Sequence, residues 1–159
     1  RTFQLMTQIA GRAGRAERPG RMLLQTLVPD HYAIQHAVEH DSAAFLEEEA
    51  GLREALGFPP AGSLALFRVS GQDRQRVEQE SSRIAGRLRG LGGHAVAVLG
   101  PMPAPIERVR GKWRFQVLAR ATSRHALGVT LKRHMEAPDG EKPPPGLQIS
   151  LDVDPYTFL

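Results

Sequence analysis

The sequence predicts a mixed α/β protein of the α+β kind, in which two helices cover one face of a four-stranded antiparallel sheet. Two observations favour this fold class. The segment Gly57–Gly62, rich in proline and glycine, interrupts a mainly helical pattern and sets a turn. Beyond it, strand and helix patterns follow in the order β-α-β-β-α-β, which is the split βαβ arrangement. The sequence therefore predicts two domains, residues 1–56 and residues 57–159.

The first domain is predicted to begin with a helix over residues 2–13. Phe3, Met6 and Ala10 share one face of this helix at the spacing of a core-facing stripe. The mostly apolar run Arg21–Val28 ends at a proline and predicts a buried strand of a parallel sheet. The intervening residues would then lie between a helix and a strand, where α/β folds often bind ligands.

Two more helices are predicted to complete this domain. Asp30 is a suitable N-cap for a helix that runs to about His40, and another helix is expected over residues 42–56. His36 and His40 lie one helical turn apart and could bind zinc together. Because a metal site needs three or four converging ligands and no third is well spaced, we expect a structural role for both.

The second domain combines strands of period two with amphipathic helices. The predicted strands are residues 64–69, 94–99, 113–121 and 147–153, and the predicted helices are residues 73–91 and 123–135. Ser123 is expected to cap the second of these helices. A proline-rich loop is expected at Pro101–Pro105, a turn at Gly111 and a mobile loop over residues 138–146.

The amino-acid composition indicates the kind of partner this chain binds and excludes some kinds of site. The 159 residues include 21 Lys and Arg, mostly arginine, against 17 Asp and Glu, and the sequence pI is about 10.1. An arginine-rich basic protein indicates a polyanionic partner, most simply nucleic acid. The absence of cysteine excludes disulfides and thiolate zinc sites in this chain and fits a reducing cytoplasm. No apolar run reaches membrane-spanning length, and no signal peptide is visible.

A motif with the spacing Gln-x-x-Gly-Arg-x-Gly-Arg follows the first predicted helical turns. Guanidinium is planar and permanently charged, so it binds phosphate oxygens in a bidentate manner. An arginine at a nucleotide γ-phosphate typically raises the transfer rate ~10³-fold or more. We therefore identify Arg12 and Arg15 as candidate catalytic residues, without deciding which one is the arginine finger. Gln8, Gly11 and Gly14 are candidate nucleotide-binding residues, because glycine lets a phosphate approach the backbone.

A second candidate site is the basic stretch Arg108–Phe115, where four cations are interleaved with two aromatic residues. Aromatic rings stack on bases and cations pair with phosphates, which indicates nucleic-acid binding. The candidate contacts are Arg108, Arg110, Lys112, Trp113 and Arg114. The alternative is that an aromatic residue anchors the core, because one face of the strand must be buried.

Asp152 and Asp154 place two carboxylates on one face of the last strand. Such a pair could hold Mg²⁺, but ion pairs with the basic strand are the preferred interpretation. The chain contains neither a Gly-x-x-x-x-Gly-Lys-[Ser/Thr] phosphate loop nor a spaced Ser-His-Asp set. We therefore expect it to complete a nucleotide site, not to hold a nucleotide alone.

The arginine motif resembles motif VI of superfamily 2 helicases, which lies on the second motor lobe and reaches ATP held by the first. Nearly the whole chain, in addition, resembles the C-terminal end of the PriA family of primosomal helicases. The residues that carry this resemblance are Thr7–Arg15, Pro29–Ile34, Leu56–Pro60, Leu99–Ile106, Arg110–Gln116 and Asp152–Pro155, in the order of the family.

The resemblance implies an ATP-dependent DNA helicase that moves 3′ to 5′, restarts stalled forks and initiates primosome assembly in the bacterial cytoplasm, associated with the nucleoid. Residues 1–56 would finish a RecA-like motor lobe, and residues 57–159 would be similar in fold to ribosomal protein S-ten. In the family, ATP and Mg²⁺ are bound by upstream motifs and zinc by an upstream cysteine cluster, none of which occurs here. The chain would then be the C-terminal part of a longer protein and inactive alone.

The resemblance also implies partners. They are branched and single-stranded DNA, other primosome proteins, and the acidic C-terminal tail of single-stranded DNA-binding protein. Arg124 matches the basic residue that the family uses for this tail, whereas Gly128 replaces a glutamine of the family pocket.

Two alternatives of a different class remain. In the first, the second domain is a stand-alone module that binds nucleic acid or a protein tail and has no catalytic role. In the second, it is a structural brace that positions motor lobes.

Overall fold

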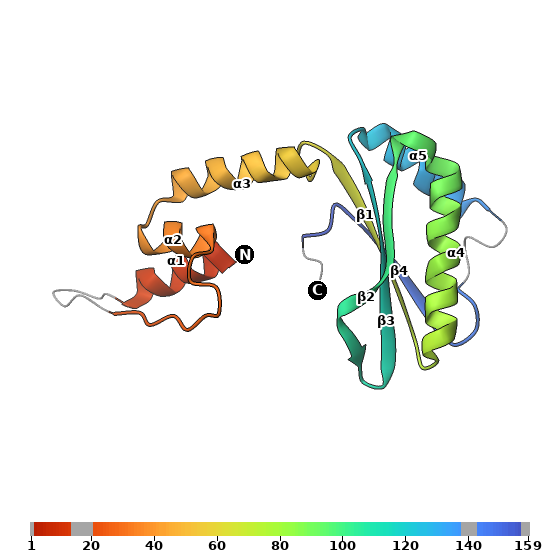
Figure 1. Ribbon diagram of the computed structural model, residues 1–159, viewed down its shortest axis with the longest axis horizontal. Helices are drawn as coiled ribbons and strands as arrows, with labels where there is room; N and C mark the ends of the chain where they lie inside the picture. Colours follow the sequence, from red (N-terminus) through yellow and green to blue (C-terminus); the bar gives the residue numbers. More distant parts are fainter. Residues whose placement is uncertain (1, 14–20, 138–142, 157–159) are drawn as a thin grey trace. The chain divides into compact units, whose positions relative to one another are not determined.

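The computed structural model describes residues 2–13, 21–137 and 143–156 (Figure 1). The described residues form five α-helices, one 3₁₀ turn and a four-stranded antiparallel sheet. They divide into two compact units, Arg1–Leu52 and Arg53–Leu159. The functional boundary expected between residues 56 and 57 stays a prediction: it falls at the end of the helix Ser42–Leu56, whereas the division between the compact units falls within that helix.

The first unit is built on three helices: α1 (Thr2–Ala13), α2 (Tyr32–Val38) and α3 (Ser42–Leu56). The bounds predicted for α1 and α3 are confirmed. A small apolar cluster holds the unit together, and its buried members are Phe3, Met6, Ala33 and Ala37. The ring of Phe3 stacks on that of Phe45 with centroids 4.0 Å apart, which ties α1 to the start of α3.

Two predictions for this unit are wrong. The run Arg21–Val28 is not a strand, and the side chains of Leu23 and Leu27 are 97% and 100% exposed. A strand needs a partner for its backbone N–H and C=O groups, and the described residues of this unit contain no other strand. In addition, α2 is capped by His31 instead of Asp30, since the His31 Nδ1 accepts a hydrogen bond from the backbone N–H of Ala33 at 3.2 Å.

The second unit has the predicted order β-α-β-β-α-β. Its elements are β1 (Ser63–Gly71), α4 (Arg74–Gly92), β2 (Ala97–Val109), β3 (Lys112–Ala121), α5 (Arg124–Met135) and β4 (Leu147–Val153), with a 3₁₀ turn at Gly93–Ala95. The strands lie in the order β2-β3-β1-β4, and all neighbours are antiparallel. Figure 1 shows α4 and α5 on one face of this sheet, which leaves β1 central and β2 and β4 at the edges.

Alternation along the central strands separates the two faces of the sheet. Ala65, Phe67 and Val69 of β1 point toward the helices and lie in the main apolar core. Asp73 caps α4 and Ser123 caps α5, each side chain accepting a hydrogen bond from a backbone N–H in the first turn. The Ser123 cap is as predicted.

The loop expected at Pro101–Pro105 is instead part of β2, which begins at Ala97 and not at the expected residue 94. Pairing with β3 is irregular here, because the register jumps from Pro103↔Phe115 to Arg108↔Trp113. Residues 104–107 of β2 therefore face Arg114 alone. Proline has no N–H to donate, and such residues are tolerated at edge strands and bulges.

The core packing of α4 can be tested with one leucine pair. Leu88 is fully buried, whereas Leu91 on the same helix is only half-buried. We expect Leu88→Ala to lower the free energy of unfolding by about 2–5 kcal/mol, because it removes buried methyl groups and leaves a cavity. The matched control Leu91→Ala is expected to cost clearly less. Urea denaturation followed by circular dichroism measures both, and equal losses would contradict the assigned core.

Candidate nucleotide, nucleic-acid and partner sites

The arginine motif begins on the exposed side of α1. Gln8 and Arg12 lie one helical turn apart, so they share a face, and both are exposed, as is Gly11 between them. A Cβ added at Gly11 would meet no other atom within 4 Å, so this turn is open to an incoming ligand. The buried face of the helix carries Phe3 and Met6 instead. Gly14 and Arg15, the other half of the motif, lie outside the described residues.

The structure splits the basic stretch between the two faces of the sheet. Trp113 lies on the helix-covered face and packs against the core next to the buried Phe115. Two guanidinium groups lie near its ring: Arg108 Cζ at 5.0 Å and Arg74 Cζ at 5.5 Å from the ring centroid. The contacts around Trp113 are thus those expected of an aromatic residue that anchors the core. Arg110 lies in the exposed turn between β2 and β3, with φ +50°.

Lys112 and Arg114 project from the opposite face of β3, away from the helices. The register aligns Arg114 with Ser70 of β1, and Ser70 in turn with Gln148 of β4. Lys112 Nζ donates a hydrogen bond to Gln148 Oε1 at 3.0 Å. Neither Ser70 nor Gln148 was predicted as a site residue, although polar residues alternate along β4 and occupy two alternate positions, Arg68 and Ser70, at the end of β1.

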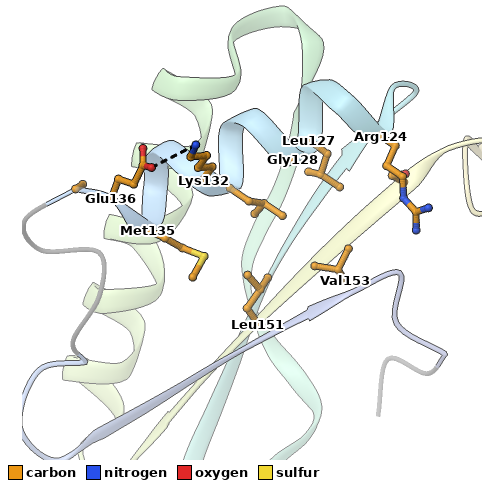
Figure 2. A pocket seen from close by; sticks show the side chains of 11 residues that line it. Arg124, Leu127, Gly128, Lys132, Met135, Glu136, Leu151 and Val153 are labelled. Atoms are coloured by element: carbon orange, nitrogen blue, oxygen red, sulfur yellow. Dashed lines mark ion pairs between the residues drawn. The ribbon is translucent and has the colours of Figure 1, made fainter.

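A groove of about 850 Å³ lies between α5 and the edge strand β4 (Figure 2). Its walls are mainly apolar, and the side chains on them include Leu127, Leu131, Met135, Leu151 and Val153. Figure 2 shows Arg124 at one end of the groove and the ion pair of Lys132 with Glu136 at the other. The groove therefore has mainly apolar walls, with the guanidinium of Arg124 at one end and a lysine–glutamate ion pair at the other.

Arg124, the predicted partner-binding residue, opens toward solvent, with its side chain 83% exposed. Its Nη2 donates to Asp154 Oδ2 at 3.0 Å, and Asp154 Oδ1 accepts from the backbone N–H of Leu64 at 2.9 Å. Gly128, one turn later, lines the groove without a side chain to fill it. A guanidinium next to an apolar trough suits a ligand that combines a carboxylate with an apolar group.

Both acidic residues of the last strand region form ion pairs, as the preferred interpretation expected. The partners differ from the expected basic strand, however: Asp152 pairs with Arg68 at 3.5 Å, and Asp154 pairs with Arg124. The reason is topological, because β4 neighbours β1 and not the hairpin of β2 and β3.

Metal binding and membrane insertion find no support in the described part of the chain. His36 Nε2 lies 2.8 Å from Glu48 Oε2, and no group of three His, Cys, Asp or Glu side chains converges there. The helices of residues 2–13, 21–137 and 143–156 are all too short or too polar to cross a membrane.

The second unit buries a histidine side chain. His134, near the end of α5, is 4% exposed and meets the ring of Phe67 edge-on with centroids 5.2 Å apart. Burial lowers the pKa of His134 below its usual 6.5, and the charges of Arg87 and Arg83 lower it further against an opposing effect of Glu80. His134 is therefore a neutral core residue at neutral pH.

The fold and these surfaces define a basic α+β module built on a split βαβ sheet, with an apolar groove and with polar residues on the part of the other sheet face that carries Arg68 and Ser70. Residues 54–156 match the family described as the primosomal protein N C-terminal domain. This match covers most of the chain, and the chain belongs to that family.

Similar proteins extend this likeness over the first unit. The chain is 35% identical over its full length to replication restart protein PriA of Bacillus subtilis, covering 20% of that protein. It is 36% identical over 99% of its length to PriA of Synechocystis and over 98% to PriA of Haemophilus influenzae, covering 18% and 21% of them. The chain thus spans about a fifth of the length of the curated relatives it matches.

The burial of His134 predicts a loss of stability in mild acid. Because its folded-state pKa lies below the unfolded value of 6.5, its contribution is fully present above about pH 6.5. It declines as pH falls from there toward the folded-state pKa, because only the unfolded chain takes up the proton. Between pH 7 and pH 5, His134→Gln should lose less stability than the wild type in urea titrations. The exposed His125→Gln is the control, and an unchanged slope in His134→Gln would contradict the assignment.

Proposed function

We propose that this chain acts in bacterial replication restart, as part of an ATP-dependent DNA helicase that moves 3′ to 5′ and initiates primosome assembly. The observation that carries the proposal is the similarity of the whole chain to replication restart proteins, together with the family match over residues 54–156. In this proposal residues 1–56 finish a RecA-like motor lobe, and residues 57–159 bind DNA and a protein partner.

The motor function assigns a task to the α1 motif. Arg12 and Arg15 would contact the γ-phosphate of ATP, Gln8 would orient polar groups of the nucleotide, and Gly11 and Gly14 would let the phosphates approach. The exposed, shared face of Gln8 and Arg12 supports this role. Hydrolysis of ATP would supply the free energy for strand separation, and the arginines of this chain would stabilise the charge that develops on its phosphates. The described residues offer no zinc ligand set, so we assign no residue to zinc.

DNA binding is proposed for the second unit. The basic residues Arg108, Arg110, Lys112 and Arg114 lie in and beside the β2–β3 hairpin and supply charge for phosphate contacts. Trp113 is half-buried against the core, so we assign it to the support of Arg108 more than to the stacking of bases.

A partner-docking function is supported by the groove of α5 and β4. We propose that it receives the acidic tail of single-stranded DNA-binding protein, with a carboxylate on Arg124 and an apolar side chain between Leu131 and Val153. Asp154 already pairs with Arg124, so an incoming carboxylate must compete with it. The exposed guanidinium and the apolar walls are the observations that favour this function.

The nucleotide role predicts a loss of ATP hydrolysis in the full-length protein. We expect Arg12→Ala or Arg15→Ala to lower kcat by ~10³-fold in at least one case, because charge that develops at the γ-phosphate is no longer stabilised. The control is the exposed Arg21→Ala. Steady-state ATPase assays with saturating DNA measure the effect. Activity near wild type in both variants would leave a stand-alone binding module as the better description.

The docking role predicts opposite effects at two neighbouring residues. Arg124→Ala should weaken binding of a fluorescent acidic-tail peptide by about tenfold, whereas Asp154→Asn should strengthen it by about threefold by releasing the guanidinium. Asparagine keeps an oxygen for the Leu64 N–H, so the backbone contact is preserved. Arg133→Ala, exposed on the same helix, is the control. If both groove variants bound the peptide like the wild type, the groove would not be its site.

A further inference from the structure

We propose that the face of the sheet opposite α4 and α5 carries, at the end of β1 that bears Arg68 and Ser70, a phosphate-binding site for the backbone of a nucleic-acid strand, which makes no use of base stacking. The site, called here the open-face cradle, consists of Arg68, Ser70, Arg114, Gln148 and Ser150. The inference rests on the proposed DNA-binding function and names the residues that perform it, most of which lie outside the β2–β3 hairpin.

The register of the sheet gathers these five residues on one face. Ser70 lies opposite Arg114 on one side and Gln148 on the other, and Arg68 lies opposite Ser150. They alternate with core residues of the same strands, so they project away from α4 and α5. All five line one cavity of about 470 Å³, which is large enough for a phosphodiester group and its neighbours.

Arg114 is the residue of the cradle that is best placed to bind an anion. Its side chain is half-buried, yet within the described residues it has no hydrogen-bond or ion-pair partner. The other arginine of the cradle differs, since Arg68 pairs with Asp152 at 3.5 Å. A guanidinium that is partly removed from water gains most from a charged acceptor, and a phosphate offers two oxygens to its fork.

The irregular pairing of β2 leaves Arg114 without a regular cross-strand partner on that side. Residues 104–107 of β2 face Arg114 alone in the register, so no regularly paired side chain lies next to it on that side. Bulges of this kind commonly re-aim a side chain at a functional position. Pro105 lies in this segment and has no N–H to donate to a regular ladder.

The remaining groups of the cradle match a phosphate and not a base. Ser70 and Ser150 contribute hydroxyl groups, Gln148 contributes an amide, and Lys112 lies at the rim with its Nζ on Gln148 Oε1 at 3.0 Å. Asp152 offsets the charge of Arg68, so the net positive charge comes from Arg114 and Lys112. The other described residues that line the cavity, Pro143, Leu147 and Ile149, are not aromatic, and Trp113 and Phe115 project to the helix side.

Recognition by such a surface should be electrostatic and independent of sequence. Phosphate contacts position a strand, whereas base contacts specify sequence. Each phosphate neutralised on a single strand contributes a salt slope of about −0.7 in log K against log salt. Stacking on the bases would add affinity that tolerates any sequence, but the cradle has no aromatic side chain on which a base could stack.

The test uses the whole 159-residue chain and a fluorescein-labelled single-stranded oligonucleotide, with affinity measured by anisotropy at several salt concentrations. We expect Arg114→Ala to weaken binding about tenfold and to reduce the magnitude of the salt slope by about 0.7. Arg114→Lys should bind with intermediate affinity, and Arg133→Ala, exposed on α5, should bind like the wild type. An abasic oligonucleotide of equal length should bind within about twofold of the normal one.

If the wild type binds DNA but Arg114→Ala binds equally well, the cradle is not the phosphate site, while the proposed DNA binding stands. A loss of affinity in Arg108→Ala would then place the site in the β2–β3 hairpin. A loss of more than about tenfold for the abasic strand would show that bases are read, which overturns the phosphate assignment. An acidic peptide that competes as well as DNA would overturn it too. If the wild type does not bind the oligonucleotide at all, both proposals fail.

Discussion

The antiparallel pairing of β1 with β3 and β4 is the constraint on which the second unit depends. Because side chains alternate along a strand, this pairing sends Phe67 and Val69 into the core and sends Arg68 and Ser70 to the other face. Helices α4 and α5 bury only the apolar face. A shift of one residue in the register would exchange the two faces, so the same hydrogen bonds that hold the fold also place the polar residues of the open-face cradle together.

Much of this second unit follows from local rules that the sequence makes visible. The cap at Ser123, the amphipathic pattern of α4 and the alternation of β4 each act within a few residues, and they predicted the order of elements correctly. The edge strand β2 was harder to predict, because prolines at 101 and 103 indicate a loop, although an edge strand tolerates them. The groove and the cradle arise from residues far apart in sequence, so the alternation of polar residues could place Ser70 and Gln148 on one face of a strand but could not bring the two together.

The first unit shows the opposite relation between pattern and structure. Its apolar run Arg21–Val28 has the composition of a buried strand but forms no ladder, because composition cannot supply hydrogen-bond partners. Where packing is local, as between Phe3 and Phe45, the helices form as predicted. The exposed Leu23 and Leu27 of this run are consistent with the proposal that the unit contributes to a larger motor lobe. Arg12 is exposed at the end of α1.

One face of the sheet builds the core of the second unit, and the other is proposed to bind a nucleic-acid backbone. Titration of the ¹⁵N-labelled chain with single-stranded DNA, followed through the amide chemical shifts, shows which face the DNA contacts. The largest changes are expected at Ser70, Arg114 and Gln148, with small changes along the solvent side of α4. Changes confined to the helices, or to the groove around Arg124, would contradict this proposal.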